Sequence, residues 1–324
     1  MTTTRRNRRK SDKKTILLSA VVPMYNEEGG IDMFFERLEP VLDAITEDYE
    51  IICIDDGSSD ATMDELLEQR GRNPRIKIIN LSRNFGKDVA LSAGLDHATG
   101  QAVVPLDADL QDPPELIAEM MEKWREGYEV VYARRSDRQS DTATRRLTAG
   151  WFYRIHNAIA DISIPDNAGD FRLIDQRVNV ALQNLPERTR FMKGLFAWVG
   201  FKQASVEYVR EERAHGSSKW QFWKLWQFAL DGITGSTTFP LRIWTYIGFV
   251  VSVTAFILST MLTVRTLFYG VDVPGYASLM VSVLFLGGIN ILATGIIGEY
   301  IGRIFTEVRR RPLYLVRETF GLDR

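Results

Sequence analysis

The chain has 324 residues, 45% of them hydrophobic and 25% charged, which is enough for one globular domain of about 200–250 residues and a further segment. Its formal net charge of −2 argues against a general nucleic-acid binder. The single cysteine, Cys53, lies in an apolar run, which excludes an internal disulfide and a cysteine-based metal site and fits a reducing compartment.

The chain starts with a basic segment. Residues 1–15 hold seven arginines and lysines with no apolar stretch behind them, so they are not expected to act as a signal peptide. We expect a disordered arm, whose charge suits the surface of an anionic membrane.

Apolar strands alternate with helical patterns in the next part of the chain. The expected strands are Ile16–Val22, Tyr49–Ile54, Ile76–Leu81, Ala102–Leu106 and Val130–Ala133, and the expected helices are Ile31–Ile45, Ala61–Gln69, Lys87–Ala98 and Pro114–Trp124. This alternation predicts an α/β fold, with a Rossmann-like, mainly parallel sheet covered by helices on both faces. In such sheets ligands bind beyond the carboxyl ends of the strands.

Polar clusters follow four of these strands at their carboxyl ends. They are Tyr25–Glu27, Asp55–Ser58, Asn84–Lys87 and Asp107–Asp109. An acidic pair such as Asp55-Asp56 accepts hydrogen bonds from a base or a ribose, and a helix cap without a ligand is the alternative. Four clusters at one edge favour a ligand site. The sequence has no Gly-x-Gly-x-x-Gly after its first strand and no Walker-type loop, which argues against a dehydrogenase or an NTPase.

Asp107 and Asp109 are the most informative pair. Because strand side chains alternate between faces, both carboxylates project to one side where the strand ends, and like charges held that close need a cation. With Gln111 they form an oxygen-only ligand set, which suits Mg²⁺ or Mn²⁺ shared with a phosphate-bearing substrate. An isolated Asp-x-Asp often caps a strand or a helix, so the neighbouring clusters carry the metal interpretation.

Further polar residues lie beyond the fifth strand. Asp170 is expected in a loop that enters an apolar stretch, where it either removes a proton from an acceptor or holds an arginine. Two basic patches, one with Arg135 and Arg138 and the other with Arg213 and Lys219, suit phosphate groups. A solvated basic surface is the alternative for each patch.

The C-terminal third is apolar. The twenty residues of Thr245–Val264 and the twenty-six of Val273–Gly298 carry no charge, so each is long enough to cross a bilayer. We expect a two-helix transmembrane hairpin, and a soluble hydrolase with two buried helices is the alternative. Basic residues flank the outer ends of the hairpin, which places both termini in the cytoplasm. Ahead of it, Trp220–Phe228 predicts an amphipathic helix at the membrane surface.

Six segments together resemble the inverting glycosyltransferases of family 2, which have a GT-A fold. The closer resemblance is to the membrane-anchored polyprenyl-phosphate glycosyltransferases, which include dolichyl-phosphate mannose synthases and bactoprenol glucosyltransferases. It extends from about Leu17 to Arg311. The matching segments are Val21-Val22-Pro23-Met24-Tyr25-Asn26-Glu27-Glu28, Asp55-Asp56-Gly57-Ser58-Ser59-Asp60, Arg83-Asn84-Phe85-Gly86-Lys87, Asp107-Ala108-Asp109-Leu110-Gln111-Asp112-Pro113-Pro114-Glu115, Gly169-Asp170-Phe171-Arg172-Leu173 and Gly216-Ser217-Ser218-Lys219-Trp220.

The resemblance implies roles and boundaries. The residues implied to bind the nucleotide are Pro23, Tyr25, Glu27, Asp55, Asp56, Lys87 and Asp107. The implied metal ligands are Asp107, Asp109 and Gln111, and the implied catalytic residues are Asp109 and Asp170. The residues implied to meet the phosphates of a lipid acceptor are Arg135, Arg138, Arg213 and Lys219. The expected domains are a basic arm at 1–15, a GT-A glycosyltransferase domain at 16–215, an interfacial region at 216–240, two transmembrane helices at 241–308 and a cytoplasmic tail at 309–324.

The resemblance also implies a reaction. The enzyme would transfer a sugar, most simply glucose from UDP-glucose, to polyprenyl (undecaprenyl) phosphate with inversion, using Mg²⁺ or Mn²⁺, at the cytoplasmic face of a bacterial inner membrane, as a multi-pass homotetramer. The absence of a Gln-x-x-Arg-Trp motif argues against a processive polysaccharide synthase. The alternatives are another donor, GDP-mannose or a UDP-amino-sugar, and a non-catalytic membrane protein that binds nucleotide or recruits partners.

Overall fold

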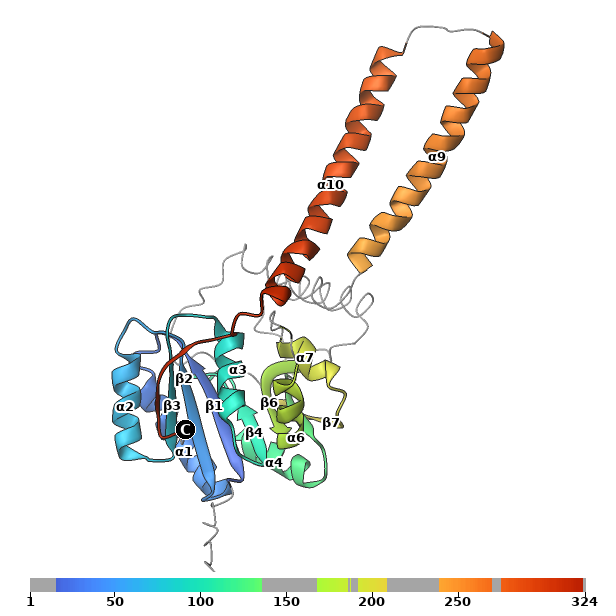
Figure 1. Ribbon diagram of the computed structural model, residues 1–324. Coiled ribbons are helices and arrows are strands. Elements are labelled where there is room, and N and C mark those ends of the chain that lie inside the picture. The colour runs from blue at the N-terminus through green and yellow to red at the C-terminus, as the bar shows by residue number, and fades with distance from the viewer. Residues whose placement is uncertain are drawn as a thin grey trace, which may run out of the picture.

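The computed structural model describes residues 16–135, 168–185, 187, 192–208, 239–269 and 275–322. Within these ranges one sheet has the strand order β7-β5-β6-β4-β1-β2-β3-β8 (Figure 1). Its strands are β1 (Leu18–Met24), β2 (Tyr49–Asp55), β3 (Ile76–Leu81), β4 (Ala102–Pro105), β5 (Val130–Arg135), β6 (Ala168–Asp175), β7 (Gln203–Tyr208) and β8 (Val316–Phe320). The helices of the sheet domain are α1 (Ile31–Ile45), α2 (Thr62–Arg72), α3 (Lys87–His97), α4 (Leu116–Arg125), α6 (Gln176–Gln183) and α7 (Met192–Trp198).

The sheet is mainly parallel, as the alternation of strands and helices predicts. Strand β1 pairs in parallel with β2 and with β4, β2 pairs in parallel with β3, and β5 pairs in parallel with β7. Because β1 has the second strand on one side and the fourth on the other, the strand order reverses between β1 and β4. Open α/β sheets bind ligands at such a reversal, beyond the carboxyl ends of the strands.

Strands β6 and β8 run antiparallel to their neighbours. Strand β6 lies between β4 and β5 and contains the backbone of Asp170. The prediction that Asp170 lies in a loop is therefore wrong. Strand β8 pairs with β3 at the sheet edge, so part of the segment expected as a tail at 309–324 joins the sheet. Both strands pair over long sequence distances, which local periodicity does not report.

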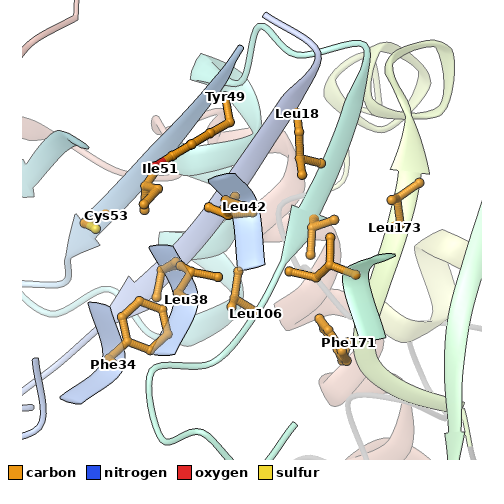
Figure 2. Close-up of a cluster of buried hydrophobic side chains, with 14 of the residues drawn as sticks. Leu18, Phe34, Leu38, Leu42, Tyr49, Ile51, Cys53, Leu106, Phe171 and Leu173 are labelled. Atoms are coloured by element: carbon orange, nitrogen blue, oxygen red, sulfur yellow. The ribbon is translucent and has the colours of Figure 1, made fainter. Parts of the chain in front are cut away.

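The core lies on both faces of the sheet, because side chains alternate along each strand. In β1, Leu18, Ala20 and Val22 belong to one buried cluster, which packs against α1, α2 and α4, whereas Val21 belongs to a second cluster with α3, α6 and α7. Figure 2 shows the first cluster, in which Phe34, Leu38 and Leu42 of α1 lie against the strands. Cys53 is fully buried in β2, as expected from its apolar run.

Two long helices, α9 (Phe239–Tyr269) and α10 (Tyr276–Arg309), extend away from the sheet domain side by side (Figure 1). One stretch of the described residues, Phe285–Arg309, is long and apolar enough to cross a membrane, and none of its most apolar window is buried within the chain. In α9 the apolar stretch Tyr246–Leu258 is shorter. One candidate span is therefore present in the described ranges, and the second span of the hairpin stays a prediction. The segment Trp220–Phe228 lies outside the described residues.

Candidate functional site

The loop after β1 is fixed to the turn that precedes α2. Asn26 adopts a left-handed backbone conformation, with φ of +54°, and its amide donates to Ser58 Oγ at 3.0 Å. In return the amide of Ser59 donates to Asn26 Oδ1 at 2.9 Å, and the amide of Glu27 donates to Thr62 Oγ1 at 2.9 Å. These reciprocal bonds place Tyr25, which is 41% exposed, at the rim of the sheet edge.

The acidic pair at the carboxyl end of β2 is buried and accepts hydrogen bonds from backbone amides. Asp55 and Asp56 are each 2% exposed. Asp55 Oδ1 accepts from the amide of Ser58 at 3.0 Å, and the two oxygens of Asp56 accept from Phe85 N at 2.7 Å and Gly86 N at 2.9 Å. Burial raises the pKa of the Asp56 carboxyl above its usual range, although both amides act to lower it. Asp56 thus links the end of β2 to the loop at residues 83–87.

Gly57 allows this turn and the 83–87 loop to touch. Its φ is +70°, and a Cβ added there would lie 2.4 Å from the carbonyl carbon of Arg83 and 2.6 Å from Asn84 N. Both neighbours are backbone atoms, so no side-chain movement can make room. Only glycine combines this conformation with this approach.

Lys87 and Asp107 bring the third and fourth clusters together. Lys87 Nζ lies 2.7 Å from Asp107 Oδ2, and both side chains are partly exposed. Two residues on, Asp109 Oδ1 accepts from the amide of Gln111 at 3.2 Å across Leu110, which has φ of +53°. Asp107, Asp109 and Gln111 are all of intermediate exposure, so solutes can reach them.

The donor set at this turn fits a hard divalent cation. Two carboxylates and one amide oxygen are the ligand types that Mg²⁺ and Mn²⁺ take, and the open sides leave room for waters and a phosphate. Among the described residues there is no group of three or more His, Cys, Asp or Glu that could hold a metal ion by itself. The amide of Gln111 and a ligand from the substrate would therefore be needed to complete the coordination.

A pocket opens beside these residues at the strand ends. Its polar side includes Lys87, Asp107 and Asp112, and its apolar side includes Phe171 and Phe196. Asp112 is held from behind by a hydrogen bond from the buried Tyr208 hydroxyl. The guanidinium of buried Arg172 stacks 4.0 Å from the ring centre of Phe196, which fixes one wall. The pocket is thus charged on one side and apolar on the other.

The structure brings most of the predicted residues to one edge of the sheet. Those at the ends of β1, β2, β3 and β4 are Pro23, Tyr25, Glu27, Asp55, Asp56, Lys87, Asp107, Asp109 and Gln111. Pro23, Lys87 and Asp107 line the same pocket. For Asp170 and Arg135 the backbone belongs to β6 and β5, and their side chains lie outside the described part of the chain. Arg138, Arg213 and Lys219 lie outside the described residues.

Several residues that line the pocket could not be predicted from the sequence. Phe171, Met192 and Phe196 come from β6 and α7, far along the chain from the strand-end clusters. An apolar residue in an apolar stretch carries no sign that it faces a pocket. Asp112 belongs to the matching segment Asp107–Glu115, but the sequence alone predicted no function for its side chain.

Comparison with known proteins assigns this site to a family. Residues 19–182 match the family described as glycosyl transferase family 2. An uncharacterized glycosyltransferase of Synechocystis is 54% identical over 95% of this chain and 97% of its own length. A prophage bactoprenol glucosyl transferase homolog of Escherichia coli is 48% identical, and a bactoprenol glucosyl transferase of Shigella phage SfII is 47% identical, each over 93% of this chain and 98% of its own length. With its mainly parallel GT-A sheet and its polar strand ends, the chain belongs to glycosyl transferase family 2.

Proposed function

We propose that the protein transfers glucose from UDP-glucose to polyprenyl phosphate with inversion at the anomeric carbon. The observation that carries the proposal is the 47–48% identity, over 93% of the chain, to proteins named as bactoprenol glucosyl transferases. The apolar stretch Phe285–Arg309 supports it, because a polyprenyl acceptor lies in a membrane.

The donor would bind across the strand ends. The nucleotide would lie against Pro23, Tyr25, Glu27, Asp55 and Asp56, where polar groups follow β1 and β2. Asp107, Asp109 and Gln111 would hold a divalent ion, Mg²⁺ or Mn²⁺, which when bound neutralises the charge of the leaving diphosphate. Lys87, which lies 2.7 Å from Asp107, adds a second positive charge at the same place.

The transfer is a single displacement. An oxygen of the polyprenyl phosphate forms a bond to C1 of the glucose as the bond from C1 to the UDP oxygen breaks, and the electron pair leaves on UDP. A phosphate dianion is nucleophilic at neutral pH, so the reaction does not require a strong general base. Asp170 acts either as a base or as a group that positions the acceptor or the metal. Arg135, Arg138, Arg213 and Lys219 would bind the acceptor phosphate.

The proposal includes the arrangement in the membrane. The domains would be the basic arm at 1–15, the catalytic domain at 16–215, the interfacial region at 216–240, two transmembrane helices at 241–308 and the tail at 309–324, with both termini in the cytoplasm of a bacterium. The protein would act as a homotetramer, which chemical cross-linking in membranes would test.

A transfer assay tests the function. Detergent-purified protein is incubated with undecaprenyl phosphate, Mn²⁺ or Mg²⁺, and radiolabelled UDP-glucose, GDP-mannose or UDP-N-acetylglucosamine. Chloroform-soluble label from UDP-glucose, with inverted configuration at C1, is the expected result. Label from another donor would change the sugar and keep the class. No lipid product from any donor, with tight UDP binding, would replace the proposal with a binding role.

A further inference from the structure

The chain returns from α10 to the sheet domain within six residues. Helix α10 ends at Arg309, and Arg310, with φ of +50°, turns the chain away while its amide donates to Glu307 O at 3.4 Å. Tyr314 then packs against the second core cluster, and its hydroxyl donates to Asp96 Oδ2 on α3 at 2.9 Å. The segment between α10 and β8 is thus attached to α3 through Tyr314.

Both backbone groups of Ser82 form hydrogen bonds with the C-terminal segment, one with Leu315 just before β8 and one with Arg317 in β8. The amide of Ser82 donates to Leu315 O at 2.9 Å, and Arg317 Nη2 donates to Ser82 O at 3.0 Å. These bonds continue the pairing of β8 with β3, in which Asn80 lies opposite Glu318 and the register shifts between Asn80 and Leu81. Ser82, the residue that follows β3, is therefore held in place by the C-terminal segment.

Ser82 directly precedes the loop that joins the two acidic clusters. Within this loop the amides of Phe85 and Gly86 donate to the buried Asp56, and the backbone of residues 83 and 84 packs against Gly57. At its far end Lys87 pairs with Asp107. A shift of Ser82 therefore moves a loop that contacts the site at residues 56–57 and at residue 107.

We propose that Arg317 and Tyr314 are positioning residues of the nucleotide site. The C-terminal strand holds Ser82, and through it the 83–87 loop, in the arrangement that binds the nucleotide of the donor. Donor binding therefore depends on the segment that follows α10, more than 200 residues along the chain from the loop it supports. The inference rests on the proposed donor site at the strand ends.

Variants of the full-length protein in detergent test the proposal. Arg317→Ala removes the side-chain donor to Ser82, and Arg317→Lys restores an amine donor of similar reach. Thr319→Ala is the matched control, because Thr319 is an exposed residue of the same strand, two positions after Arg317. For each variant we would measure amide hydrogen exchange of residues 82–87, the Kd for UDP with Mn²⁺, and the Tm.

Arg317→Ala should speed exchange at residues 82–87 and weaken UDP binding about fivefold, the size expected from one hydrogen bond, with the Tm little changed. Arg317→Lys should recover most of the binding, and Thr319→Ala should resemble the wild type. Combining Arg317→Ala with Tyr314→Phe should enlarge the effect. Unchanged UDP affinity in the double variant, or faster exchange across the whole sheet with a lower Tm, would overturn the proposal. None of these three readouts needs the lipid acceptor, so failure of glucosyl transfer is a separate outcome.

Discussion

Glu50 and Asp55 lie near opposite ends of β2. The contacts of Glu50 stabilise the fold, whereas Asp55 belongs to the proposed nucleotide site. Glu50 is 1% exposed and accepts from Ser19 Oγ at 2.5 Å, from Thr99 N at 2.8 Å and from Lys77. Burial by itself would raise its pKa, but these donors and the Lys77 charge outweigh burial and hold the pKa of Glu50 below its usual range. This network joins β1, β2 and β3 far from the ligand edge.

Glu50→Gln should destabilise the fold and leave donor binding intact. It leaves Lys77 without its partner charge, which we expect to cost about 2–4 kcal/mol at neutral pH. Because the folded-state pKa is lowered, the carboxylate stabilises the fold above the unfolded pKa of about 4.3 and loses this contribution as the pH falls through the folded value. The difference in unfolding free energy from wild type should therefore shrink below about pH 4.

Thermal unfolding in detergent between pH 3 and 8 measures this difference. Glu68→Gln is the control, since Glu68 forms an exposed pair with Arg72 on α2 and should cost less than about 0.5 kcal/mol. If Glu50→Gln changed the donor KM as well as the Tm, Glu50 would affect donor binding as well as stability, which would contradict the prediction.

Asp109→Asn should abolish turnover with little loss of fold. The side chain is partly exposed, and the side-chain oxygen of an asparagine can still accept the hydrogen bond from the amide of Gln111. Loss of the divalent ion should lower kcat at least about 10³-fold, since metal stabilisation of a leaving group contributes several kcal/mol. The control is Asp64→Asn, the same change on an exposed residue of α2. Full activity of Asp109→Asn would remove Asp109 from the metal site.

At the scale of elements, the turn between β2 and α2 and the 83–87 loop act as one unit. Gly57 and Gly29 both have positive φ, +70° and +79°, but only at Gly57 would a Cβ meet other atoms. Gly29→Ala should therefore cost about 1 kcal/mol from backbone strain alone. Gly57→Ala should cost more and should displace the loop that supports Asp56, with a higher donor KM. Donor titrations and Tm values of the two variants, compared side by side, test this; equal effects would exclude the contact with the loop.

The burial of each element determines whether the sequence could predict it. Strands β1 to β5 are largely apolar on both faces and separated by helices, and helix α1 and strand β3 have the predicted bounds. The polar clusters at their ends were identifiable because parallel strands bring their carboxyl ends to one edge. Strand β8 was missed because four of its five residues are exposed and its pairing partner lies more than 200 residues away. The pocket wall at Phe171 and Phe196 was missed for the same reason, since only the tertiary fold brings these residues to the strand ends.

At the scale of the whole molecule, the sheet constrains how the chain crosses the membrane. It contains β7, which precedes α9, and β8, which follows α10. A folded sheet does not pass through a bilayer, so the chain between β7 and β8 crosses it an even number of times. Among the described residues only α9 and α10 lie between these strands. If Phe285–Arg309 crosses, a second crossing is required, and the length of α9, about 46 Å at 1.5 Å per residue, suffices for it.

Cysteine labelling tests this topology without removing the native cysteine. Cys53 is fully buried, and burial raises the pKa of its thiol, so it should stay silent towards a membrane-impermeant maleimide. Thr319→Cys, at an exposed position of β8, should be labelled only after the cells are opened. Asp272→Cys, between the two helices and outside the described residues, should be labelled in intact spheroplasts. Labelling of both positions from the same side would mean that α9 and α10 do not cross as a hairpin, and release of the protein by a salt wash would mean that neither crosses. Labelling from opposite sides would place the nucleotide site and the tail that supports it together in the cytoplasm, where nucleotide sugars are made.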